Sequence, residues 1–192
     1  DLARAVSERG FEGRVAASHC VSLGMQTPEM QAMVAAEVAA AGIAVIPLPQ
    51  TNLYLQGRNH QTGSPRGLTA IGPLREAGVI VAAGGDNVQD PFNLVGRSDP
   101  LETAALMVMA GHLLPEVAYE AVSNDVRRVM GLAPVRFQIG DPADFLAIDA
   151  PSIRGAIADA PADRMTFHAG RLVATTTTTR AIYRPAGQAS SG

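Results

Sequence analysis

A short apolar run with a polar ending decides the fold of this chain: VIVAAGGDN, from Val79 to Asn87. Its first five residues are continuously apolar, which predicts a strand buried on both faces rather than one with a face in water. Two similar runs come earlier, at 15–18 and 43–46. Each is followed by a segment of helical composition, and this alternation favours a parallel α/β sheet with both faces covered.

Local signals place the helices between and after these runs. The sequence predicts a helix at the start of the chain, a loop over residues 50–67, and a helix that Thr69 caps. The Asp99-Pro100 pair begins another helix that runs to about His112. The helix capped by Thr69 runs to Ala77, and further helices are expected at 29–41, 115–123 and 125–132. Three parallel strands are too few for a doubly wound domain or a closed barrel, so residues 1–135 are predicted to be part of a larger α/β unit.

The character of the sequence changes after Gly131. Short apolar segments separated by turn residues predict a small β region over residues 136–184, with the threonines at 175–179 extending its last strand. Residues 185–192 are rich in small and polar residues and are expected to form a disordered tail.

Composition excludes several classes of protein. The chain has 192 residues, a net charge of −3 and no cluster of Lys or Arg, which argues against a nucleic-acid partner. Its longest apolar stretch is broken by Glu37 and Gly42, so no membrane span is expected. The one cysteine, Cys20, excludes a disulfide within the chain and favours a cytoplasmic location.

Polar residues follow two of the three apolar runs. His19 comes directly after the first run, and Asp86 follows the third. Because the carboxyl ends of parallel strands meet at one edge, the two side chains are predicted to share a metal or acid/base site. Structural roles are the alternative, since a histidine also serves packing and an Asp after Gly-Gly also forms turns or caps helices.

Four segments resemble the cytosine-deaminase branch of the amidohydrolase superfamily. They are RVAASH ending at His19, NLYLQGR from Asn52 to Arg58, GDNVQDPF from Gly85 to Phe92, and IGDPADFL over 139–146. The resemblance implies the C-terminal part of a (β/α)8 TIM barrel, with about three parallel strands, followed by a small β-sandwich segment.

The resemblance also implies an activity. Members hydrolyse C–N bonds with a water activated by one divalent metal ion, zinc or iron, because the metal lowers the pKa of that water. Asp86 matches a metal ligand, and His19 matches a histidine beside the metal and its water. Both are therefore candidate catalytic and metal-site residues. Gln56, Asn87 and Phe92 match positions near the substrate, although loop stabilisation, capping and packing are alternatives for them.

The departures from the family pattern bear on activity. The sequence has no His-x-His pair and no Glu proton shuttle after a histidine, so three of the four expected metal ligands are absent. Asn87 and Phe92 replace an acid and a Trp of bacterial cytosine deaminases, which leaves aminotriazines or cyclic amides as alternative substrates.

We therefore expect the complete protein to deaminate cytosine or a related amino-heterocycle, and these 192 residues to be inactive alone. They would pair with a missing N-terminal half or form a homo-oligomer. The second hypothesis is that the chain is a non-catalytic fragment.

Overall fold

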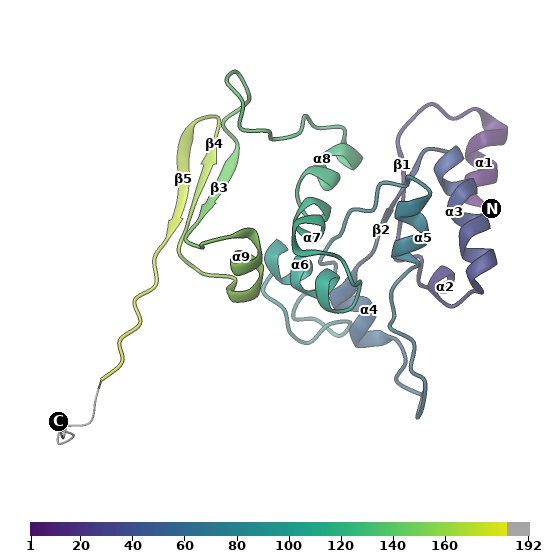
Figure 1. Ribbon diagram of the computed structural model, residues 1–192, viewed down its shortest axis with the longest axis horizontal. Coiled ribbons are helices and arrows are strands. Elements are labelled where there is room, and N and C mark those ends of the chain that lie inside the picture. The colour runs from purple at the N-terminus through teal and green to yellow at the C-terminus, as the bar shows by residue number, and fades with distance from the viewer. Residues whose placement is uncertain (184–192) are drawn as a thin grey trace.

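The first two apolar runs form adjacent parallel strands in the computed structural model, which describes residues 1–183 (Figure 1). β1 (Val15–Ser18) pairs with β2 (Ile43–Ile46) over their full length. Residues 79–83 lie on the other side of β2 and run in the same direction. The predicted parallel direction of all three runs is confirmed.

The third run is less regular than expected. It makes one bridge to β2, between Val81 and Val45, and regular ladder pairing does not extend beyond it. The next position on the β2 side is Pro47, whose carbonyl accepts the N–H of Gly84 at 3.2 Å. Because proline has no N–H to donate in return, the ladder loses a hydrogen bond at this point.

Helices connect and cover these strands, with one group beside β1 and β2 and another between them and the second sheet (Figure 1). Prolines occupy the first turn of α3, α4, α6 and α7, where their missing N–H costs nothing. In the described part of the chain, no helix is long and apolar enough to cross a membrane. The helices are α1 (Leu2–Arg9), α2 (Val21–Gly24), α3 (Pro28–Ala40), α4 (Pro49–Leu55), α5 (Ile71–Glu76), α6 (Pro100–Met109), α7 (Pro115–Ala121), α8 (Asn124–Met130) and α9 (Ile153–Asp159).

The loop predicted over residues 50–67 was wrong in its first part, because α4 begins at Pro49. Its polar residues at 50–52 suggested a loop in water, yet all three are buried. The short helices α2 and α9 were not predicted either. In α9 a glycine in the first turn weakens the helical pattern, while the Ser152 hydroxyl caps the helix by accepting the Gly155 N–H at 3.0 Å.

Two predicted helix ends also differ. Ala70, not Thr69, precedes α5, and the Thr69 hydroxyl is buried with no hydrogen-bond partner in the described chain. α6 ends at Met109 instead of His112. A glycine at 111 disfavours continuation of the helix, and His112 adopts a left-handed φ of 56°.

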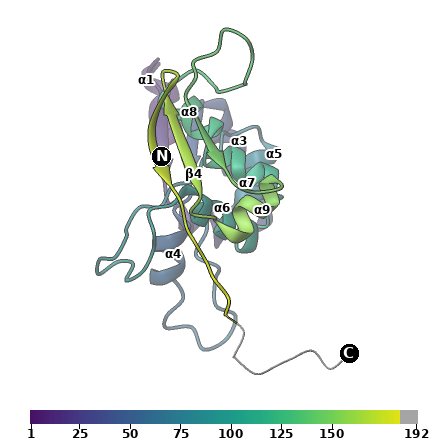
Figure 2. The ribbon, with the colours of Figure 1, turned by 90° about the vertical axis from the view of Figure 1, so that its left-hand side faces the viewer.

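The predicted C-terminal β region is confirmed as an antiparallel sheet in the order β3 (Phe145–Ile148), β4 (Arg164–His168), β5 (Arg171–Thr176). Figure 2 shows this sheet and α9 on the side nearest the viewer, with α6 and α7 behind them. β5 ends at Thr176, so the threonine run extends the strand by less than predicted. The predicted disordered tail at 185–192 lies outside the described residues.

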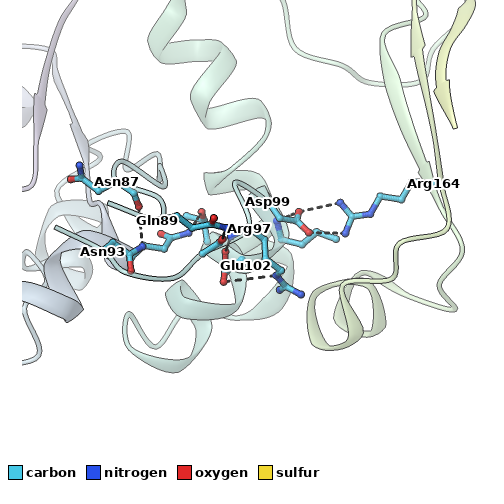
Figure 3. A network of polar contacts seen from close by, with 11 residues as sticks. Asn87, Gln89, Asn93, Arg97, Asp99, Glu102 and Arg164 are labelled. Atoms are coloured by element: carbon cyan, nitrogen blue, oxygen red, sulfur yellow. Dashed lines mark hydrogen bonds and ion pairs between the residues drawn. The ribbon is translucent and has the colours of Figure 1, made fainter. Parts of the chain in front are cut away.

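One ion pair joins the antiparallel sheet to the helices. The Arg164 guanidinium on β4 donates two hydrogen bonds to the Asp99 carboxylate, at 3.1 and 2.8 Å (Figure 3). The same carboxylate caps α6 by accepting the Leu101 N–H at 3.0 Å. Both side chains are largely buried, so Asp99 fixes a helix end and a strand at one point.

We expect the two roles of Asp99 to be separable by substitution. Asp99→Asn keeps a good N-cap but loses the charge, and it should lower the free energy of unfolding by about 1.5–3 kcal/mol, as for hydrogen bonds to charged groups. Asp99→Ala should cost about 1 kcal/mol more, because the cap is also lost. Urea unfolding of the three proteins measures both steps, and equal losses in the two variants would show that the cap contributes nothing.

The same comparison has a predicted pH dependence. Burial raises the pKa of Asp99, but the hydrogen bonds from Arg164 and from the Leu101 N–H outweigh it and hold the net pKa below its ordinary value. A lowered pKa stabilises the folded state above the ordinary value, and this contribution is lost as pH falls through the folded value. The difference in free energy of unfolding between the parent protein and Asp99→Asn should therefore be constant near neutral pH and shrink below about pH 4.

Candidate functional site

His19 and Asp86 stand where two parallel segments end. His19 directly follows β1, and its N–H still bonds the carbonyl of Ile46 at 3.0 Å. Both residues have positive φ angles, 63° for His19 and 61° for Asp86. Histidine and aspartate are among the non-glycine residues that adopt this region more readily. The backbone therefore turns away from the sheet at both positions, and both side chains lie at its carboxyl edge.

The two side chains face each other at this edge. His19 Nε2 lies 3.8 Å from Asp86 Oδ2, and the side chains are 43% and 32% exposed. This separation is too long for a direct hydrogen bond. It is short enough for both groups to reach one small molecule between them, and both remain open to solvent. The predicted juxtaposition is confirmed, while the catalytic and metal-binding roles stay predictions.

Helix α4 supplies a second layer of polar groups behind this pair. Asn52, only 2% exposed, places its Oδ1 2.8 Å from Nδ1 of His19. Its neighbour Thr51 contacts Asn87, one residue after Asp86, through hydrogen bonds at 3.2 Å to the side chain and 3.0 Å from the backbone N–H. Helix α4 therefore forms hydrogen bonds with both segments that carry the candidate residues.

Asn87 organises the loop that follows Asp86. Its amide nitrogen donates to Asp90 Oδ2 at 2.5 Å, and Asn93 donates to its backbone carbonyl at 2.9 Å (Figure 3). The hydrogen bond from Asn87 lowers the pKa of Asp90, helped by backbone N–H groups. Because Thr51 already binds its Oδ1, both ends of the Asn87 side chain are engaged within the protein. Its predicted contact with substrate remains a prediction.

Gln56 and Phe92 lie farther out in the same loops. Gln56 follows α4 and is exposed, and its backbone N–H closes the helix on Asn52 O at 2.9 Å. Phe92 is 55% exposed, with its backbone N–H bonded to Asp90 Oδ1 at 2.8 Å. No hydrogen bond within residues 1–183 joins either side chain to His19 or Asp86. Their substrate-binding roles also stay predictions.

The donors in this chain do not by themselves fit a catalytic metal ion. Within residues 1–183 no group of three or more His, Cys, Asp or Glu side chains converges. His19 and Asp86 provide one imidazole and one carboxylate, whereas a catalytic zinc takes three protein ligands.

Comparison with known proteins decides the family. A family model described as "Amidohydrolase family" matches residues 1–177. The chain belongs to the amidohydrolase family. Among curated proteins it is similar to a pterin deaminase of Rhizobium rhizogenes, with 34% identity over 177 residues. That match covers 90% of this chain and 40% of the relative, so this amidohydrolase chain spans less than half the length of the curated relative.

Solved structures support the fold of this amidohydrolase chain. A 5-methylcytosine deaminase of Klebsiella pneumoniae liganded with 5-fluorocytosine superposes with a TM-score of 0.83 at 24% identity, covering 95% of this chain and 45% of that one. An N-isopropylammelide isopropylaminohydrolase of Burkholderia multivorans gives a TM-score of 0.77 at 26% identity, covering 91% and 43%.

The sequence does not single out Asn52. Its motif predicts a functional side chain at Gln56, four residues later. The burial of Asn52 and its contact with His19 arise only when α4 lies beside the residue that follows β1.

Asn87→Asp is expected to destabilise the loop at neutral pH. The new carboxylate would stand against Asp90 at the position of a 2.5 Å contact, and repulsion would raise the pKa of the pair. A raised pKa means that the penalty disappears as pH falls, so the melting temperature should approach that of the parent at mildly acidic pH. Thermal unfolding of the parent and the variant, measured at neutral and at mildly acidic pH, tests this. Asn87→Ser, which adds no charge, is the control; its deficit should stay unchanged at mildly acidic pH and shrink only below about pH 4, where Asp90 itself takes up a proton.

Proposed function

We propose that the complete protein hydrolyses a C–N bond of a nitrogen heterocycle, releasing an amine or ammonia. The observation that carries the proposal is the approach of His19 Nε2 to Asp86 Oδ2, at 3.8 Å, in a chain of the amidohydrolase family. The names of its relatives support the reaction class, since two are deaminases and one is an aminohydrolase. Cytosine or a related amino-heterocycle is the proposed substrate class, with pterins, aminotriazines and cyclic amides as alternatives.

The proposed chemistry is general acid–base catalysis by this pair. Hydrolytic deamination requires a proton to leave the attacking water and another to reach the departing nitrogen. A carboxylate and an imidazole that face one point can perform both transfers. Asp86 and His19 are the groups in this chain that the geometry favours for these roles.

We further propose that the complete enzyme binds one divalent metal ion, zinc or iron. Asp86 and His19 are its donors in this chain, and the other ligands come from a segment of the relatives' length that residues 1–192 do not span. On the same basis, residues 1–135 form part of a (β/α)8 barrel and residues 136–184 a β-sandwich segment. The TM-score of 0.83 to a deaminase supports this assignment.

The proposal extends to the location of the protein in the cell and to its binding partners. A single cysteine favours the cytoplasm. A small heterocycle is the proposed ligand, and pairing with an N-terminal half, or homo-oligomerisation, would complete the protein. The exposed edge of β1 and the exposed face of β5 are consistent with such pairing.

Asparagine substitutions test the proposed roles without disturbing the backbone, since asparagine also tolerates a positive φ. In the protein at the full length of its relatives, Asp86→Asn and His19→Asn should each lower kcat by about 10²–10⁴-fold. Release of ammonia or amine from cytosine, pterin and an alkylaminotriazine is the measurement. A second aspartate–histidine pair, Asp144 with His168 at 2.9 Å, offers a matched control. Asp144→Asn should leave activity unchanged, and normal activity of Asp86→Asn would overturn the proposal.

Residues 1–192 alone should neither hold metal tightly nor turn over substrate. Two donors cannot replace the three or more ligands of a catalytic site. The chain would be purified, dialysed against zinc and iron, and assayed for bound metal and for ammonia release. Stoichiometric metal with turnover would contradict the shortage of donors, whereas activity that depends on an added upstream segment would support it.

A further inference from the structure

The contact between His19 and Asn52 bears on which imidazole nitrogen carries the hydrogen. The two atoms that meet, Nδ1 of His19 and Oδ1 of Asn52, are 2.8 Å apart. An amide oxygen only accepts hydrogen bonds, and a neutral imidazole carries a hydrogen on one nitrogen. In this arrangement Nδ1 therefore carries the hydrogen, and Nε2 presents a lone pair toward the space beside Asp86.

The backbone of Asn52 is held in place by its neighbours. It is 2% exposed, its N–H bonds Leu48 O at 3.0 Å, and its carbonyl accepts the Gln56 N–H at 2.9 Å. Gly67 packs so closely against it that an added Cβ would lie 2.9 Å from the Asn52 carbonyl oxygen. The asparagine cannot shift without displacing this turn, whereas the half-exposed His19 ring is the more movable partner.

The rest of the Asn52 side chain is used for no other bond. Its amide nitrogen is buried and has no hydrogen-bond partner within residues 1–183. A buried N–H without a partner costs about 1–3 kcal/mol. The contact with His19 is thus the one hydrogen bond that the Asn52 side chain makes in the described chain, and a purely packing role would be served better by leucine.

We propose that Asn52 is a positioning residue that holds His19 in the tautomer with hydrogen on Nδ1, so that Nε2 faces the site as an acceptor. The effect on catalysis rests on the proposed function, but the tautomer itself does not. An Nε2 lone pair can accept a proton from water or a substrate, or bind a metal ion. An Nε2 that carries the hydrogen can do neither.

The first test reads the tautomer directly. The sequence has four histidines, so long-range nitrogen–proton NMR correlations of the labelled 192-residue chain can be assigned by comparison with His19→Asn. The spectrum is recorded at about pH 8.5, where imidazole is neutral. We expect His19 to carry its hydrogen on Nδ1. A hydrogen on Nε2 in the parent protein would overturn the inference.

Variants separate positioning from packing. Asn52→Leu removes the acceptor at similar volume and should shift His19 toward the Nε2–H tautomer, while Asn52→Asp keeps an acceptor and should retain Nδ1–H. Gln50→Leu is the matched control, since it places a leucine in the same turn of α4 and its bond goes to Thr103 at 2.7 Å. It should leave the His19 signals unchanged. An unchanged tautomer in folded Asn52→Leu would also overturn the inference.

The second test reads catalysis in the full-length protein. Asn52→Leu should lower kcat by at least about 10-fold with little change in KM, and Asn52→Asp should restore part of it. If His19→Asn leaves activity intact, the proposed function fails while the tautomer result still stands. If His19→Asn abolishes activity and Asn52→Leu does not lower it, the positioning role fails.

Discussion

The backbone of β2 is bonded along both of its sides, and the arrangement of the site depends on this central position. β1 pairs with one side, and the run at 79–83 bridges to Val45 on the other. Because all three segments are parallel, their carboxyl ends meet at one edge of the sheet. The residues that follow the two outer segments, His19 and Asp86, are brought together across β2 for this reason. Val45 is 2% exposed, so the same strand also anchors the core.

Helix α4, which follows β2, fixes the positions of the side chains at this edge through hydrogen bonds. Its residues 50–52 are three consecutive polar residues, and each bonds a different part of the chain: Thr103 on α6, Asn87 in the loop after Asp86, and His19 after β1. Buried polar groups are costly unless they are paired, so each of these bonds favours one arrangement of the neighbouring segment over others. The helix that directly follows β2 therefore holds in place both segments that carry the candidate residues, His19 and Asp86.

Helix α6 links this region to the antiparallel sheet. Its Thr103 receives the bond from α4, and the carboxylate of Asp99 at its start binds Arg164 on β4 (Figure 3). Ile157 of α9 belongs to the same buried cluster as Met107 of α6. The small sheet is therefore attached to the parallel region through both apolar packing and a largely buried ion pair, and the covalent connection is not its sole support.

The sequence by itself determined the apolar runs, their parallel order, and the polar residue after each outer run, because continuous burial of a strand requires a continuous apolar stretch. It also predicted a small β region within residues 136–184, where the structure has β3, β4 and β5. It did not determine α4, Asn52 or the engagement of Asn87. Residues 50–52 have the composition of a solvated loop, and their partners lie 33, 36 and 53 positions away in the chain. Only tertiary structure decided these features, since a polar side chain is buried at low cost only where folding brings a distant partner to it.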